Sequence, residues 1–214
     1  MKPLLIATAL LCSLPVHADT LFNYDGFYAR MKKSEKAEFS DITLAFELQK
    51  AGTTEPCVVD KALITTDISE APLTQAANGE LVLPYDQVLN DNKALIRLIQ
   101  PAGEAQCDLN FKLRSRLPIA EKTELKVLQR MHSQFDQLLD SLAGVSKYWL
   151  PEVQGLTLHF AAEVVASSAN PKVQAALQCE QKSCQLMLTH ALPEGAIIEF
   201  SQTPLYATPL LVRP

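Results

Sequence analysis

The stretch CDLNFKLR, residues 107–114, alternates apolar and polar side chains along its whole length. A period of two residues is typical of a strand that has one face on a core and the other in water. The stretch ITLAFEL, residues 42–48, shows the same alternation. Cys107 and Phe111 fall on the apolar side of the first stretch, so both are expected to face the core. Two half-buried strands of this kind predict an antiparallel, strand-rich fold.

Further strands are predicted on either side of this pair. Shorter apolar or alternating runs occupy residues 57–64, 81–83, 93–100, 156–160 and 197–200. Residues 173–179 and 184–190 are expected to form a hairpin. The tail contains Pro204, Pro209 and Pro214, and we expect it to lie extended along a sheet edge, where proline is tolerated.

One long helix is predicted from Glu121 to Ala143, because its apolar residues recur at steps of three and four and Gly144 supplies a C-terminal stop. The stripe consists of Leu125, Leu128, Met131, Phe135, Leu138 and Leu142. We expect this stripe to pack on a sheet of the same chain; a seam for a second copy or a partner is the alternative. A shorter helix is expected over residues 26–36.

The fold class that follows is α+β: strand-rich, with mostly antiparallel sheets and one long amphipathic helix packed on them. Pro118 marks a boundary between a strand-rich N-terminal subregion, residues 19–118, and a subregion of helix plus C-terminal strands, residues 119–214. A chain of this size is compatible with one domain or with two small ones.

The first 18 residues have the form of a cleavable secretory signal. Lys2 precedes an uncharged apolar run from Leu4 to Leu14, which is shorter than the roughly 20 residues that a membrane-spanning helix needs. Cleavage is expected between Ala18 and Asp19; a retained membrane anchor is the alternative. No later stretch reaches the length of a transmembrane segment, so the mature chain is expected to be soluble.

Four cysteines remain after cleavage, and an even number in an exported chain predicts disulfides. Three pairings are possible; the spacing favours Cys179 with Cys184 across a short turn and Cys57 with Cys107 across a long loop. The cysteines show no pair of C-x-x-C spacings, which argues against a zinc site and against a thioredoxin-like redox site. We therefore expect no metal.

Charge makes nucleic acid an improbable partner. The formal net charge is -5, and loss of Lys2 with the signal makes the mature chain slightly more acidic. Nucleic acids require clustered basic residues, whereas Lys112, Arg114 and Arg116 alternate along a strand and are typical of a solvated face.

Searches for catalytic and cofactor motifs find none: there is no nucleophile elbow, no H-E-x-x-H, and no glycine-rich phosphate loop. No cofactor and no catalytic residue is therefore assigned. His159 lies on the polar side of its strand and could act as a base or a metal ligand, but a solvated or locally paired imidazole is the favoured interpretation. The same applies to His132 and His190.

Aromatic side chains are the remaining candidates for recognition. Phe22, Tyr24, Phe27 and Tyr28 could stack on a sugar or a peptide, or could anchor the mature N-terminus in the core. Tyr148 and Trp149 allow the same two interpretations, with Trp149 as a pocket wall.

The run FNYDGFYARMKK, residues 22–33, resembles the opening of an exported gammaproteobacterial family called domain of unknown function 2987. The resemblance continues in LPYD at 83–86, in the cysteines at 57 and 107, in the long helix, and in YWLP and GLTLHF at 148–151 and 155–160. It implies export to the periplasm and nearly the whole mature chain as one unit, and it supplies no activity.

Three classes of function follow. The leading hypothesis is a non-enzymatic periplasmic protein that binds another protein or component of the cell envelope, since sheet edges and aromatic residues can recognise a partner without catalytic groups. A binder of a small molecule or glycan at Tyr148 or Trp149 is the alternative. A hydrolase that uses an Asp or Glu with His159 is the least favoured.

Overall fold

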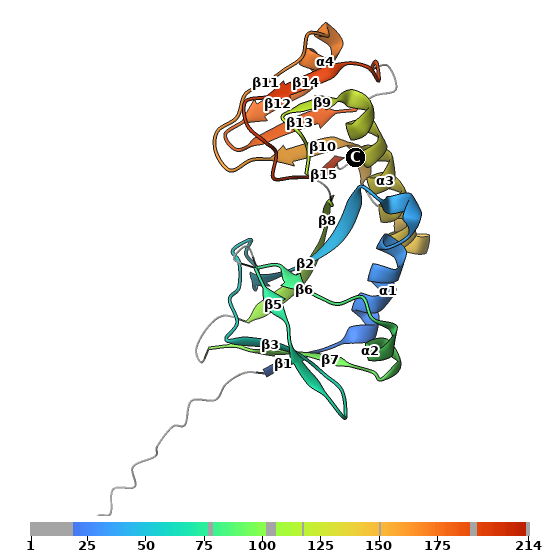
Figure 1. Ribbon diagram of the computed structural model, residues 1–214, viewed down its shortest axis with the longest axis vertical. Helices are drawn as coiled ribbons and strands as arrows, with labels where there is room; N and C mark the ends of the chain where they lie inside the picture. Colours follow the sequence, from blue (N-terminus) through green and yellow to red (C-terminus); the bar gives the residue numbers. More distant parts are fainter. Residues whose placement is uncertain are drawn as a thin grey trace, which may run out of the picture.

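Figure 1 shows the computed structural model of the chain, a curved and elongated molecule. The structure describes residues 19–76, 79–101, 106–116, 118–149, 151–188 and 192–212. The predicted signal segment and the cleavage position at Ala18 lie outside the described residues, while Asp19 opens the first strand. The fold is α+β and strand-rich, with several antiparallel sheets and one long helix, as predicted.

The N-terminal part of the chain consists of short elements around two longer strands. They are β1 (Asp19–Asn23), α1 (Tyr24–Ser34), the 3-10 helix η1 (Ala37–Phe39), β2 (Ile42–Lys50), β3 (Lys61–Thr65), β4 (Glu70–Pro72), β5 (Thr74–Gln75), β6 (Leu81–Val82), α2 (Gln87–Asp91), β7 (Leu95–Ile99) and β8 (Cys107–Ser115). Strands β1, β7, β3 and β4 form one antiparallel sheet in that order, and β5 pairs with β6.

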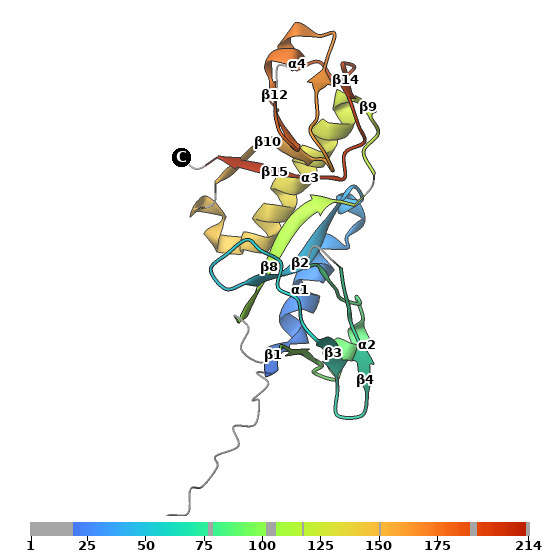
Figure 2. The same cartoon turned by 90° about the vertical axis from the view of Figure 1, so that its left-hand side faces the viewer.

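Strands β2 and β8 form a separate two-stranded antiparallel ribbon, in which Phe46 lies opposite Phe111. Helix α1 lies along one side of this ribbon, and the ribbon forms the waist of the molecule between the two groups of sheets (Figures 1 and 2). Both stretches that the alternating pattern predicted as strands, 42–48 and 107–114, are confirmed, and each is the other's partner.

The C-terminal part begins with β9 and the long helix. Its elements are β9 (Lys122–Glu124), α3 (Leu125–Ala143), the 3-10 helix η2 (Gly144–Trp149), β10 (Glu152–His159), β11 (Ala166–Ser167), α4 (Pro171–Ala175), β12 (Leu177–Glu180), β13 (Ser183–Met187), β14 (Ile197–Phe200) and β15 (Tyr206–Val212). One sheet has the order β12-β13-β10-β15 and a smaller one the order β11-β14-β9. Residues 206–212 of the tail therefore lie along a sheet edge as β15, as expected, and Pro214 lies outside the described residues.

The apolar stripe of α3 is buried within its own chain. Leu125, Leu128, Phe135 and Leu138 are fully buried, and the helix packs against β10 as well as contacting β2. Full burial of a side chain of this kind contributes about 1.5–3 kcal/mol. This supports the expected packing on a sheet of the same chain rather than a seam for a second copy.

Three elements of the structure differ from the elements that the sequence patterns predicted. Residues 171–175 form helix α4 instead of the start of a hairpin strand, because the Asn170 side chain accepts hydrogen bonds from the backbone N–H groups of Lys172 and Val173 and Pro171 occupies the first turn. The strand expected from residue 57 begins only at Lys61. The long helix begins at Leu125, because residues 122–124 pair with β14 as β9.

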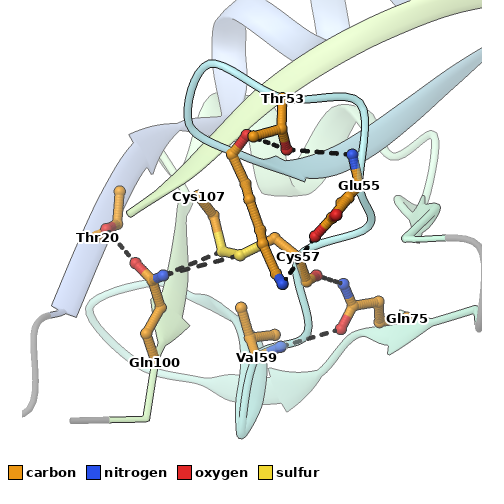
Figure 3. Close-up of a disulfide and its surroundings, with 9 residues drawn as sticks. Thr20, Thr53, Glu55, Cys57, Val59, Gln75, Gln100 and Cys107 are labelled. Carbon is orange, nitrogen blue, oxygen red and sulfur yellow. Dashed lines mark hydrogen bonds and ion pairs between the residues drawn. A yellow bond between two sulfur atoms is a disulfide. The ribbon is translucent and has the colours of Figure 1, made fainter. Parts of the chain in front are cut away.

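Two disulfides are present, with the pairing that the spacing favours. Cys179–Cys184 joins β12 to β13 across their hairpin, with a Cα–Cα distance of 4.0 Å. Cys57–Cys107 links the loop after β2 to the start of β8, with a Cα–Cα distance of 5.8 Å (Figure 3). Cys57 is thus in a loop and not on a strand, because its N–H donates to the Leu48 carbonyl and keeps this segment beside β2.

Polar groups surround the Cys57–Cys107 bridge, and Gln100 among them is buried. The Gln100 amide nitrogen lies 3.0 Å from the sulfur of Cys107, and the Thr20 hydroxyl donates to the Gln100 amide oxygen at 3.4 Å (Figure 3). Gln75 donates to the Cys57 carbonyl oxygen. The bridge therefore connects β8 to the β1 and β7 sheet as well as to the loop.

Each four-stranded sheet is built from one of the two predicted subregions, and β8 and β15 meet where the Ala207 N–H donates to the Ser115 hydroxyl at 2.9 Å. The division of the chain into subregions 19–118 and 119–214, within one domain or as two, stays a prediction. Over the described part of the chain, no helix has the length and hydrophobicity needed to cross a bilayer.

Candidate binding site

The aromatic residues at the start of the mature chain divide into two pairs. Tyr24 and Tyr28, one turn apart on α1, are buried. The Tyr24 hydroxyl donates to the Pro84 carbonyl and accepts from the Asp86 N–H at 3.1 Å, while Tyr28 stacks on Tyr85 with ring centroids 5.1 Å apart. Burial raises the pKa of Tyr24, so its hydroxyl remains a donor. This pair anchors the N-terminus in the core.

The other pair, Phe22 and Phe27, lines a pocket of about 180 Å³. Its walls come from four elements: Phe22 of β1, Phe27 and Arg30 of α1, Phe46 of β2, and Leu109, Asn110 and Phe111 of β8. The Phe27 ring meets the Phe46 ring edge-on at 5.2 Å and the Phe22 ring at 6.1 Å. We call this set of seven residues the aromatic pocket.

Phe111 forms the open side of the aromatic pocket. The alternating pattern placed it on the core face of its strand, yet half of it (50%) is exposed, because α1 covers β2 and leaves the far side of β8 uncovered. The Arg30 guanidinium lies over the Phe111 ring, 5.3 Å from its centroid. Such a cation–π contact contributes about 0.5–1 kcal/mol at an exposed position.

Arg30 differs from four other arginines in its charged partners. Arg97, Arg114, Arg116 and Arg130 each pair with a carboxylate. Among the residues that the structure describes, no carboxylate pairs with Arg30, whose guanidinium donates instead to the Gly26 carbonyl at 2.7 Å. The pocket therefore combines an aromatic interior with a positive charge at its mouth, an arrangement suited to an apolar group that has an anionic neighbour.

The aromatic candidates at 148 and 149 do not form this pocket. Trp149 ends the 3-10 helix η2, and its side chain is 89% exposed, so it does not form the wall of a closed cavity. The backbone of Tyr148 lies in the same turn, and its side chain lies outside the described residues. Strand β10 separates this turn from His159 by about 23 Å of extended chain, so the three candidates do not form one site.

His159 ends β10 in a partly buried polar cluster. Its ring stacks on Tyr206 at 4.6 Å, and its Nε2 lies 3.0 Å from the Thr208 hydroxyl. Burial lowers the pKa of His159 below its usual 6.5, and the positive charge of Lys112 lowers it further. The imidazole is therefore neutral near pH 7, as a base must be, but within the described chain no carboxylate bonds to it in the manner of a catalytic triad.

His132 and Asp86 also have structural partners. His132 bonds to the Val153 carbonyl at 2.7 Å, and Asp86 caps α2 by accepting from two backbone N–H groups. His190 lies outside the described residues. No group of three or more His, Cys, Asp or Glu residues that could hold a metal ion is found in the described ranges.

Lys112 and Arg114 of β8 pair with Glu47 and Glu80, and Arg116, directly after the strand, pairs with Glu35. The basic face that the alternation indicated is thus neutralised by acidic neighbours within the same chain.

A family model described as "Protein of unknown function (DUF2987)" matches residues 17–160. The chain belongs to this family. No curated protein and no solved structure matches it. The match ends at β10, so the family region lacks β13 and β15, the two neighbours of β10 in its sheet. The resemblance was expected to span nearly the whole mature chain, and the match covers a shorter part.

The segments that carry the family resemblance contact one another. Tyr24 and Tyr28 of the N-terminal run bind Pro84, Asp86 and Tyr85 of the LPYD segment. These contacts hold α1 in place beside the ribbon, and α1 supplies Phe27 and Arg30 to the aromatic pocket. The N-terminal run thus supplies Phe22, Phe27 and Arg30 to the walls of the pocket. The LPYD segment contributes no wall and supports the pocket by holding α1 in place.

Proposed function

We propose that this member of the DUF2987 family is a non-enzymatic binding protein of the cell envelope, and that it holds an apolar side chain of a partner protein in the aromatic pocket. The observation that carries the proposal is the half-exposed Phe111 at the mouth of a pocket walled by three further phenylalanines. A large aromatic side chain left open to water in this way is typical of interaction sites, where aromatic residues and arginine are enriched.

The size of the pocket favours a side chain over a whole ligand. Sites for small molecules and cofactors usually enclose about 300–1,000 Å³, whereas the aromatic pocket encloses about 180 Å³. One ring or one branched aliphatic group fills a space of this size, and the rest of the ligand must lie outside it. A polypeptide that inserts a single residue satisfies this condition.

Export to the periplasm is part of the proposal. Two disulfides are typical of proteins that fold in an oxidising compartment. The signal-like residues 1–18 add to this support, since cleavage before Asp19 would leave β1 at the start of the mature chain.

A second candidate is a binder of a polar small molecule in the C-terminal part. A hollow of about 770 Å³ lies between the loop around Ser168 and the start of β14, with the Lys122–Glu199 ion pair at its rim. Its volume is within the usual range for ligand sites. However, its described lining contains no aromatic side chain on which a sugar could stack.

Site-specific photo-crosslinking in living cells tests the proposal. A photoreactive phenylalanine analogue is placed at position 111, and the matched control carries it at position 68, where Ile68 is 89% exposed on a loop away from the pocket. We expect the label at 111, and not at 68, to capture one defined envelope protein, and Phe27→Ala to weaken the capture.

Equal capture at both positions would refute a binding role for the pocket. A purified protein that carries a small molecule in native mass spectrometry, with no protein captured at 111, would favour the second candidate.

A further inference from the structure

The outer edge of β8 lacks a strand partner. In the described chain β8 pairs only with β2, and the ribbon has no third strand beside β8. Unpaired strand edges are sites to which other polypeptides add, and proteins usually cover or disrupt them.

The hydrogen bonds of β2 identify the backbone groups that this edge leaves open. The Leu48 N–H donates to the Gly79 carbonyl at 2.8 Å, and the Leu48 carbonyl accepts from Cys57, so both groups of Leu48 point away from β8. Leu48 lies opposite Leu109, which makes this a pair without mutual hydrogen bonds. By the alternation of the ladder, the N–H and C=O groups of Leu109, Phe111 and Leu113 point to the outer edge.

The open edge and the aromatic pocket are continuous. Leu109 and Phe111 contribute side chains to the pocket and backbone groups to the edge. A strand laid beside β8 would place alternate side chains on the pocket face, with Cβ atoms about 4.5–5.5 Å from those of the residues directly opposite. A residue opposite Phe111 would also come close to the guanidinium of Arg30, which lies over the Phe111 ring.

We infer that the partner binds as an extended segment that adds a strand to the outer edge of β8. One apolar side chain of the segment fills the aromatic pocket, and an acidic side chain two residues away pairs with Arg30. This inference rests on the proposed function and specifies the binding mode: main-chain hydrogen bonds along the edge and two side-chain contacts that select the sequence.

The charge at the edge favours a segment of a different protein over a second copy of this chain. If two copies paired through their β8 edges, the two Phe111 residues would approach each other, and each Arg30 guanidinium over its ring would face a like charge. An acidic residue in a foreign strand supplies the missing opposite charge. The open stretch, residues 109–113, is also short, because β15 meets β8 at Ser115.

Peptide selection followed by backbone methylation tests the inference. A displayed library of random eight-residue peptides is selected on the wild-type protein and counter-selected on Phe111→Ala. The enriched peptides are expected to share an apolar residue two positions from Asp or Glu. Arg30→Gln is expected to weaken their binding about tenfold, the lower end of what a hydrogen bond to a charged group contributes.

Synthetic copies of one enriched peptide then carry N-methyl groups on alternate residues. Methylation of the set whose N–H groups face β8 should weaken binding at least tenfold, because two or three hydrogen bonds are lost. Methylation of the other set is the matched control and should change binding less than threefold. Amide exchange should slow at Leu109, Phe111 and Leu113 when the peptide is bound.

The possible failures are distinct. Peptides that depend on Phe111 but tolerate both methylated sets would overturn strand addition and leave the proposed binding function intact. A library that yields no Phe111-dependent peptide would count against the proposed function itself. A concentration-dependent dimer that protects the same three amides would overturn the inference by placing a second copy at the edge.

Discussion

Removing the Cys57–Cys107 disulfide should destabilise the protein about twice as much as removing Cys179–Cys184. The first bridge joins residues 50 apart and the second joins residues 5 apart. The entropy that a cross-link removes from the unfolded chain grows with the logarithm of the loop length, which gives about 4 kcal/mol for the long loop and about 2 kcal/mol for the short one. Since domains are commonly stable by only 5–15 kcal/mol, the long-range bridge supplies a large share of the total.

The assay compares two double variants, Cys57→Ala with Cys107→Ala and Cys179→Ala with Cys184→Ala, by urea unfolding. Thermal unfolding provides a second measurement. At about 2–4 °C per kcal/mol for a chain of this size, we expect the midpoint temperature to fall by about 8–16 °C without Cys57–Cys107 and by about 4–8 °C without Cys179–Cys184. Equal losses, or a larger loss for the short-range pair, would refute the loop-entropy reasoning and point to packing around the sulfur atoms instead.

Three further outcomes are expected. Gly155→Ala should lower the free energy of unfolding by about 1–3 kcal/mol or more, because an added Cβ would lie 2.0 Å from the Leu186 carbonyl oxygen. Gly195→Ala is the control: no atom lies within 4 Å of its added Cβ, so thermal unfolding should be nearly unchanged. Because the pKa of His159 is lower in the folded state than its usual 6.5, the unfolded chain binds the proton first; stability should fall as pH drops below about 6.5, until the folded pKa is passed, and His159→Gln should flatten this part of the curve. Asn170→Ala removes the cap of α4 and should cost about 1 kcal/mol in urea unfolding; no measurable loss would show that the cap contributes little.

Much of the fold could be predicted because its strongest signals are local and periodic. The alternation at 42–48 and 107–114 and the stripe of α3 each specify one buried face, and burying that face leaves few arrangements for the element. Predictions failed where a few residues override a pattern. At 171–175 a capping asparagine and a proline start a helix inside an apparent strand, and at Cys57 a single backbone hydrogen bond holds the chain in a loop.

The candidate site was only partly predictable. Phe22 and Phe27 stood out in the sequence as members of an aromatic cluster, and the structure gives the two tyrosines of that cluster the anchoring role and the two phenylalanines the pocket. Phe111 was missed, because the alternating pattern of its strand is the same whether or not another element covers it. Trp149 and Tyr148 attracted attention as rare large side chains, and no local pattern distinguishes an exposed ring from a pocket wall.

The sequence alone predicts the two long strands and the long helix, favours the observed cysteine pairing and contains none of the catalytic motifs that were sought. Alternation, helical periodicity and residue spacing are properties of the linear chain. The packing of α1, which covers β2 but stops short of the edge of β8, follows from the tertiary arrangement and from no local pattern. That arrangement leaves Phe111 half exposed and brings Arg30 over its ring. In the described chain it also leaves the outward backbone groups of Leu109, Phe111 and Leu113 without a strand partner. Coverage of a strand edge depends on how elements far apart in the chain pack together, and the residues of the strand do not encode it.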